Sequence, residues 1–338
     1  MPDSNKLIVV LGAHRSGTSL CAAALQALGA DPCLGEHYAN DENQKGFFEH
    51  PDIVDFNDRL LAYLGGSWDN PLFQPRPGLD TPELDSWLAE ASSLLVEIYG
   101  GAEVAVLKDP RICQLLPFWR RAINEAGYAS GHVYFVHTLR DPVEVALSQQ
   151  QRALANPDFY EVGRELGEGA ALWLSLTAQV LADDAAPAMC YVDYPGLLTT
   201  PAMVLDRLEA FAGLRRNPGL AHAFIEDFVD PALYRSSASA EARAAVAAVL
   251  PQALAVHQHL QQAAGGSLAA EEVAACRDIV AQPETQAALA TIMIPALSRL
   301  SSNSRRDRLA LVLRDEMLAD TQAQVEELRA NEAQLRAE

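Results

Sequence analysis

The chain has 338 residues and a formal net charge of −20 at pH 7, with 45 acidic side chains against 25 from Lys and Arg. A chain this acidic lacks the extended basic surface needed for broad binding to nucleic acid or to an anionic membrane, which argues against both functions. Hydrophobic residues make up 49% of the chain, enough for a large core. Any anionic ligand must therefore be held by a few local cations.

The sequence indicates neither a metal site nor a membrane segment. Its five cysteines are scattered, without a C-x-x-C pair or the spacing of metal ligands. The first apolar run, Leu7–Leu11, is too short for a signal peptide or a membrane span, and charged residues follow it too soon. We therefore expect a cytoplasmic protein that holds no metal.

Short apolar runs along the chain have the pattern of buried parallel strands, and they are Leu7–Leu11, Val104–Leu107, Val133–Leu139 and Met189–Val192. Stretches of helical periodicity lie between them, over Thr18–Leu28, Leu115–Ala126, Pro142–Arg152 and Phe159–Ala182. This alternation predicts an α/β fold with a parallel sheet covered on both faces by helices. Ligands of such folds bind at the carboxyl ends of the strands.

The loop Gly12-Ala-His-Arg-Ser-Gly-Thr-Ser19 follows the first strand and opens a helix. Its glycines let backbone amides turn toward a phosphate, and the helix N-terminus adds donors and a favourable dipole. The spacing nearly matches the loop of nucleoside triphosphatases, but Thr18 replaces their lysine, and Arg15 stands two positions before the second glycine. Such a loop suits a single 5′-phosphate better than a magnesium-bound triphosphate. The alternative is a plain glycine-rich turn between strand and helix.

A second candidate anion site follows the third strand, at Arg140-Asp-Pro-Val-Glu-Val-Ala-Leu-Ser148. Arg140 stands at the ligand edge of the sheet, and Pro142 suits the first turn of the next helix. Ser148 lies two helical turns further on, and together the two polar side chains can hold a phosphate from two sides. Alone, Arg140 is equally well explained by a local salt bridge. Combined with the first loop, it predicts a ligand with two phosphates.

With these motifs in place, the sequence resembles the sulfotransferase superfamily, whose members use 3′-phosphoadenosine 5′-phosphosulfate (PAPS). The family loop [K/R]-S-G-T-[S/T] corresponds to Arg15-Ser-Gly-Thr-Ser19, and the family's R-[D/N]-P motif with a later serine corresponds to Arg140 and Ser148. Lys108-Asp-Pro-Arg111 and the segment Tyr191–Leu198 resemble the bacterial and carbohydrate-directed branches. The resemblance covers roughly residues 5 to 215.

Two departures accompany the resemblance. The chain has Asp193-Tyr-Pro where family members often have Glu-Asp-Leu. It also has no convincing Lys-Gly-x-x-Gly loop, which in cytosolic relatives closes over the 3′-phosphate, and Arg235 is the substitute candidate for that loop. The residues that contact adenine therefore stay unassigned.

The resemblance implies a P-loop-like fold and transfer of a sulfuryl group from PAPS to an acceptor hydroxyl, of a carbohydrate or a small metabolite, with no metal. Arg15 would act on the 5′-phosphate and the leaving oxygen, while Arg140 and Ser148 would hold the 3′-phosphate. The remaining residues assigned to 5′-phosphate binding come from the first loop, and they are His14, Ser16, Gly17, Thr18 and Ser19. For His14 the alternative is that it only fills a turn.

The acceptor side of the reaction is assigned from the same resemblance. Similar enzymes place a catalytic Glu or His near Gly46-Phe-Phe-Glu-His50, so Glu49 is the first candidate for the base and His50 the second. The alternative is that Phe47 and Phe48 anchor a loop and Glu49 caps the next helix. Lys108 would neutralise a sulfuryl oxygen or orient the acceptor, or it forms a salt bridge to Asp109 or to a helix terminus.

The chain divides by pattern into three parts. A nucleotide-binding core spans 1–215, with a helical insertion at about 30–101 that includes predicted helices Asp52–Leu64 and Pro82–Tyr99. A helical extension spans 216–300. In the last part, 301–338, apolar residues recur at sevens, which predicts a short coiled coil that joins copies into a homo-oligomer, or a single solvated helix.

Two other functions stay open at this point. A P-loop kinase or nucleotide hydrolase requires a lysine at position 18 and an aspartate on the second strand for magnesium, and the lysine is absent. A non-catalytic scaffold that retains the fold is the other alternative. The expected acceptor is a glycan or another neutral hydroxyl compound, because a polyanionic acceptor would be repelled by the acidic chain.

Overall fold

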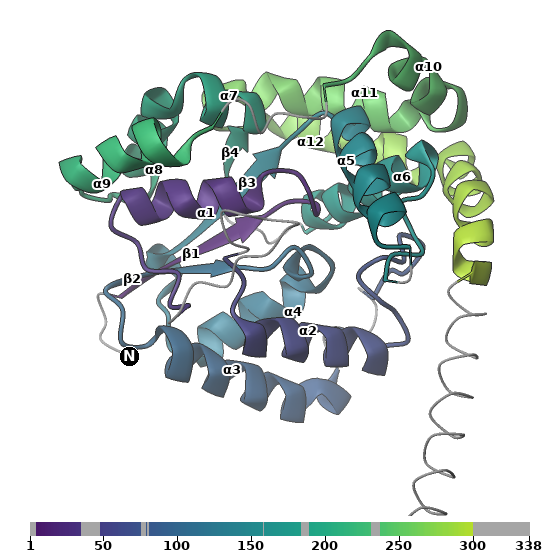
Figure 1. Cartoon of the computed structure of the whole chain (residues 1–338). Helices are drawn as coiled ribbons and strands as arrows, with labels where there is room; N and C mark the ends of the chain where they lie inside the picture. The colour runs from purple at the N-terminus through teal and green to yellow at the C-terminus, as the bar shows by residue number, and fades with distance from the viewer. Residues whose placement is uncertain are drawn as a thin grey trace, which may run out of the picture. The chain divides into compact units, whose positions relative to one another are not determined.

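The computed structural model describes residues 5–34, 48–75, 79, 81–157, 159–183, 189–230 and 237–299 (Figure 1). Three of the features predicted from the sequence lie outside these residues, namely Phe47, Arg235 and the C-terminal segment 301–338. The chain divides into two compact units, Met1–Met293 and Ile294–Glu338. The sheet and the site below belong to the described part of the first unit.

A parallel sheet forms the centre of the first unit. Within the described residues it has four strands in the order β2-β1-β3-β4, and these are β1 (Lys6–Leu11), β2 (Val104–Lys108), β3 (Val133–Leu139) and β4 (Met189–Asp193). Each neighbouring pair is parallel. The predicted strands are confirmed to within one residue at each end. Leu7 to Leu11 are fully buried, because helices cover both faces of the central strand.

The helices that follow or flank these strands are α1 (Thr18–Ala27), α2 (Pro51–Tyr63), α3 (Asp85–Tyr99), α4 (Ile112–Glu125), α5 (Pro142–Ala155), α6 (Leu166–Leu181), α7 (Tyr194–Thr199) and α8 (Pro201–Ala212). Beyond them lie α9 (Pro218–Ala223), α10 (Ala240–Val249), α11 (Pro251–Leu260), α12 (Ala270–Ala281) and a helix over 283–299. In Figure 1, α1 and α8 lie on one face of the sheet, and α2, α3 and α4 lie on the other. The predicted α/β fold with a mainly helical C-terminal region is confirmed.

One helix begins later than its pattern predicts. The periodicity placed its start at Phe159, whereas α6 begins at Leu166. A capping box formed by Glu165 and Glu168 starts the helix, and Gly163 just before it has a φ of +96°. A helix cannot continue through that backbone conformation, so the preceding residues form a loop.

The strand order decides where a ligand can bind. The chain passes from β1 to β2 on one side, and then returns past β1 to place β3 on its other side. The loops that leave β1 and β3 therefore diverge at the carboxyl edge, and in open α/β sheets this switch point is the usual ligand crevice. Among the described residues, no helix combines the length and the apolar character needed to cross a membrane.

Candidate functional site

The loop after β1 requires glycine at two positions. Gly12 has a φ of +143°, and a Cβ there would lie 2.2 Å from Thr138 Oγ1. Gly17 has a φ of +95°, and a Cβ there would lie 2.4 Å from Cδ2 of Tyr194. Both positions combine a left-handed backbone with a close neighbour, which only glycine tolerates. The loop is therefore held tightly against the ends of β3 and β4.

Within the loop, Ser16 has a structural role. Its hydroxyl donates to the Ala13 carbonyl at 2.6 Å and lies 2.9 Å from Thr138 Oγ1. Its amide donates to the same Ala13 carbonyl at 3.1 Å. These bonds close a turn at the start of the loop. The sequence analysis assigned Ser16 to 5′-phosphate binding, and in the structure both its amide and its hydroxyl donate to the Ala13 carbonyl.

Helix α1 begins directly after this turn. Gly17 is its N-cap in a left-handed conformation, and no side chain among the described residues caps it. Its first turn contains no acidic residue. A helix N-terminus without a cap presents backbone N–H groups and the positive end of the helix dipole. This end of α1 is therefore suited to an anion.

The two predicted anion sites meet at Arg15. Its Nε donates to Ser148 Oγ on α5 at 3.0 Å, and its carbonyl accepts from Arg140 Nη1 at 2.9 Å. Arg140 also pairs with Glu144 at 3.2 Å. Arg140 and Ser148 are both buried. The loop after β1 and the helix after β3 thus form one cationic cluster at the switch point of the sheet.

Tyr194 belongs to this cluster, although sequence reasoning did not select it. Its ring covers Gly17, and the Arg140 guanidinium lies 4.3 Å from its centroid, which is a cation–π contact. The preceding residue, Asp193, caps α7 by accepting from the Gly196 amide at 2.7 Å. The departure Asp193-Tyr-Pro therefore has a local purpose. The sequence signal that could have selected Tyr194 is its position directly after β4, at the ligand edge of the sheet.

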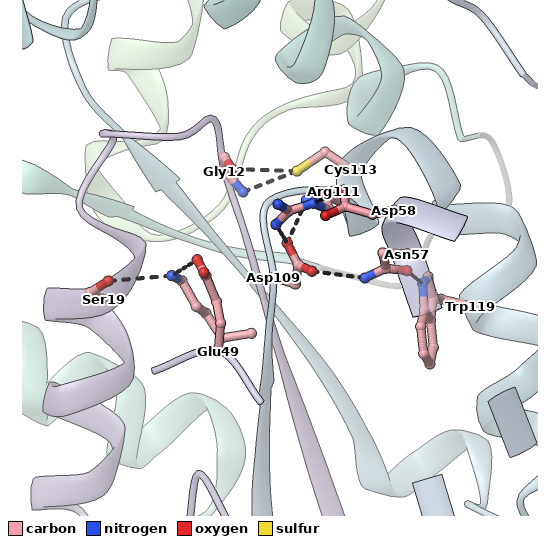
Figure 2. Close-up of polar contacts among 10 residues, drawn as sticks. Gly12, Ser19, Glu49, Asn57, Asp58, Asp109, Arg111, Cys113 and Trp119 are labelled. Atoms are coloured by element: carbon pink, nitrogen blue, oxygen red, sulfur yellow. Dashed lines mark hydrogen bonds and ion pairs between the residues drawn. The ribbon is translucent and has the colours of Figure 1, made fainter. Parts of the chain in front are cut away.

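A second group consists of Lys108 with Glu49 and Ser19, and the last two are labelled in Figure 2. Lys108 is buried, and its Nζ lies 2.5 Å from Glu49 Oε1 and 3.3 Å from Ser19 Oγ. Lys108 therefore forms an ion pair with Glu49, and the described residues show none between Lys108 and Asp109. The alternative in which Glu49 caps the next helix is wrong, because His50 is the N-cap of α2 and its Nδ1 accepts from the Asp52 amide at 3.3 Å.

Asp109 directly follows Lys108 and anchors the end of β2. It is fully buried and accepts from Asn57 Nδ2 at 2.9 Å and from Arg111 Nη1 at 3.1 Å. Asn57 in turn accepts from Trp119 at 2.8 Å, and Arg111 also pairs with Asp58 at 2.6 Å. Figure 2 shows this chain of contacts from the end of β2 into α2 and α4. These contacts fix the turn that directly follows Lys108.

Cys113, near the start of α4, contacts the loop after β1. Sequence reasoning assigned it no contact. Its sulfur accepts from the Gly12 amide at 3.2 Å and lies 3.5 Å from the Gly12 carbonyl (Figure 2). Burial raises the pKa of Cys113 to about 12, so the side chain stays a neutral thiol at pH 7. It therefore holds the start of the phosphate loop without adding a negative charge.

The residues that the structure describes contain no group of three or more His, Cys, Asp or Glu side chains placed to hold a metal ion. The site as described is an anion-binding edge with cations from the loop after β1, the end of β2 and the end of β3. Two carboxylates lie against these cations, Glu49 on Lys108 and Glu144 on Arg140. This arrangement can bind phosphate groups and offers a carboxylate next to them.

Comparison with known families decides the classification. A family model described as the sulfotransferase family matches residues 8–218, more than half of the chain. The chain belongs to the sulfotransferase family. The matched range holds every residue of the site, from the loop after β1 to Tyr194. The predicted superfamily is thereby confirmed, and sulfotransferase membership supports an enzyme that transfers a sulfuryl group to an acceptor.

Solved structures similar to this sulfotransferase include two domains. The sulfotransferase domain from the Synechococcus PCC 7002 olefin synthase has 16% sequence identity and a TM-score of 0.41, over 70% of this chain and 85% of that one. The sulfotransferase domain from the curacin biosynthetic pathway has 16% identity and a TM-score of 0.35, over 64% and 76%. No curated protein matches the sequence.

Proposed function

We propose that this protein transfers the sulfuryl group of PAPS to a hydroxyl of a neutral carbohydrate. The observation that carries the proposal is the contact between Arg15 and Ser148, at 3.0 Å. This contact joins the loop after β1, which suits one phosphate, to the end of β3 and its helix α5, which suit another. A donor with a 5′-phosphosulfate and a 3′-phosphate has the two anionic groups that such a paired site requires.

The 5′-phosphosulfate would bind at the N-terminus of α1. The amides of Gly17, Thr18 and Ser19 provide donors there, and so do the hydroxyls of Thr18 and Ser19. Arg15 lies beside them and would stabilise the charge that develops on the leaving oxygen. The 3′-phosphate would bind Arg140 and Ser148, whose neighbour Tyr194 keeps the Arg140 guanidinium in place.

The transfer step uses Glu49 and Lys108. The acceptor oxygen attacks sulfur in line, the bond from sulfur to the bridging oxygen breaks, and its electron pair goes to the 5′-phosphate. We assign the proton of the acceptor hydroxyl to Glu49 and the stabilisation of the sulfuryl oxygens to Lys108. The 2.5 Å contact between these two residues keeps base and cation adjacent. His50 is the alternate base, although its Nδ1 accepts from the Asp52 amide.

The kinase alternative loses support at β2. That function needs an aspartate after this strand to bind magnesium. Asp109 stands there, but both of its oxygens accept hydrogen bonds, from Asn57 and Arg111, and it is fully buried. Thr18 also stands where the triphosphate loop needs a lysine. A metal-bound triphosphate therefore fits this edge less well than a phosphosulfate.

The acceptor class follows from charge. The chain has a net charge of −20, which disfavours approach of a polyanionic acceptor. A neutral glycan meets no such barrier. A small neutral hydroxyl compound shares this advantage and is the second acceptor class.

Calorimetry with 3′-phosphoadenosine 5′-phosphate (PAP) tests the donor assignment. We expect binding that does not change when EDTA replaces magnesium. Tighter binding of ATP with magnesium would overturn the proposal. The acceptor is tested by incubating the protein with ³⁵S-labelled PAPS and panels of neutral glycans, sulfated glycans and small alcohols. Label on the neutral glycans is expected, and label confined to either other panel contradicts the carbohydrate assignment.

A further inference from the structure

His14 is held in the phosphate loop by an aromatic wall. Its imidazole packs on Trp68, with ring centroids 4.5 Å apart and an interplanar angle of 54°. Tyr160 meets Trp68 edge to face at 6.4 Å. The Arg152 guanidinium lies 5.2 Å from the centroid of the Trp68 ring and 4.1 Å from that of the Tyr160 ring. Arg152 stands one helical turn beyond Ser148 on α5. The imidazole is therefore fixed beside the proposed donor site.

One atom of this imidazole lacks a partner. The Nε2 atom of His14 is buried and makes no hydrogen bond among the described residues. Buried polar atoms in native proteins are almost always hydrogen-bonded. An exception inside a ligand-binding loop indicates that a ligand atom completes the bonding. Because His14 directly precedes Arg15, that ligand would be the phosphosulfate.

The charges around the imidazole oppose its protonation in the absence of a ligand. Among the described residues, four cations act on it from different elements: Arg15 in the loop, Lys108 at the end of β2, Arg111 before α4, and Arg152 on α5. Burial first, and then these cations, lower the pKa of His14 well below 6.5. Nearby carboxylates offset the charge of these cations only in part. Glu49 pairs with Lys108, Asp58 and Asp109 pair with Arg111, and Asp69 lies near Arg152.

A bound donor reverses this balance. In PAPS the 5′-phosphate and the sulfate bonded to it carry one negative charge each, and the 3′-phosphate, a monoester, carries about −1.5 to −2 at neutral pH. Placed against Arg15 and Lys108, this charge offsets the repulsion that a proton on His14 experiences. The imidazolium then has both a favourable field and an acceptor for its Nε2–H.

We infer that His14 binds a proton from solvent together with the donor, and that its Nε2–H donates to an oxygen of the phosphosulfate. The inference rests on the proposed donor, because it assigns the anion that draws the proton. The loop then gains an additional cation only when it holds its ligand. An empty loop avoids the extra repulsion among the four cations already there.

The test is calorimetry of PAP binding in buffers of different ionisation enthalpy, from about pH 6 to about pH 9. Wild-type protein should take up as much as one proton per PAP. Its association constant should fall by up to about tenfold per pH unit, between the pKa of His14 in the empty protein and its higher pKa in the complex. His14→Asn should lose this uptake and this slope. The titration of PAP itself is common to both proteins and cancels in the difference.

A matched control and a second readout keep the outcomes separate. His222→Asn removes an exposed imidazole on α9 and should leave the proton uptake unchanged. NMR of the wild-type histidine side chains should show one resonance, absent from His14→Asn, whose pKa rises when PAP binds. If PAP binds and neither the uptake nor this pKa depends on His14, the inference is overturned while the donor assignment stands. If PAP does not bind at all, the proposed function itself fails.

Discussion

Arg15 and Ser148 are 133 residues apart in the chain, yet Arg15 Nε donates to Ser148 Oγ at 3.0 Å. The first follows β1 and the second lies on the helix after β3. These strands are neighbours in the sheet, so the two loops meet at the switch point. Because both residues lie at that edge, we expect the loop and the strand end to act on one ligand, so their contributions to its binding can be measured together.

Removal of either arginine should weaken PAP binding. Arg15→Ala and Arg140→Ala each delete a charge-assisted contact to a phosphate, for which we expect about 2 kcal/mol, or roughly a 30-fold rise in Kd. Calorimetry measures this directly. Arg59→Ala is the matched control, since its guanidinium pairs with Asp55 and Glu90 on the exposed side of α2. Unchanged Kd values for both loop variants would contradict the donor site.

Glu49→Gln should lower turnover by about 10²-fold or more, because the acceptor hydroxyl would lose its proton acceptor. PAP affinity should change little, since Glu49 contacts Lys108 and is not assigned to either phosphate. The comparison variant is His50→Asn, which keeps a side chain able to cap α2. We measure kcat and the Kd of PAP for both. Loss of turnover in His50→Asn alone would move the base to His50.

Gly17→Ala should destabilise the fold more than Gly65→Ala. Both glycines have a positive φ, of +95° and +84°. A Cβ at Gly65 would meet nothing within 4 Å, whereas one at Gly17 would lie 2.4 Å from the Tyr194 ring. Backbone strain of about 1 kcal/mol is common to both variants, and the clash adds about 1–3 kcal/mol at Gly17 alone.

Urea denaturation of these two variants provides the measurement. The double variant Gly17→Ala with Tyr194→Ala should recover most of the difference, because the ring that clashes is removed. Equal loss of stability in both single variants would show that Tyr194 does not cover the loop in solution.

Asp109→Asn should destabilise the protein by about 3 kcal/mol, because it removes the charge that Arg111 faces in a buried site. It also brings two amide NH₂ groups together at Asn57. Asp52→Asn is the control at an exposed carboxylate three residues beyond Glu49, in the first turn of α2. Thermal unfolding of both variants checks the prediction. A stable Asp109→Asn protein that loses nucleotide binding only in the presence of magnesium would instead support the kinase alternative.

Local signals were sufficient to predict much of this protein. Buried parallel strands are nearly continuous apolar runs, so β1 to β4 could be found from the sequence. The phosphate loop is also local, since its glycines, Arg15 and the start of α1 lie within eight residues. Arg140 and Ser148 share one strand end and its helix. Each of these features can therefore be recognised from a short stretch of the chain, although distant residues also contact the phosphate loop.

Contacts between distant segments were decided only by the tertiary structure. Lys108 pairs with Glu49, 59 residues away, because the insertion folds back over the end of β2. Tyr194 covers Gly17, and Cys113 holds Gly12, because the order β2-β1-β3-β4 brings both the β4 and the β2 connections to the loop after β1. The strand order depends on how the helices pack on the two faces, which no short stretch of sequence encodes. For the same reason the aromatic wall around His14 could not be predicted from the sequence.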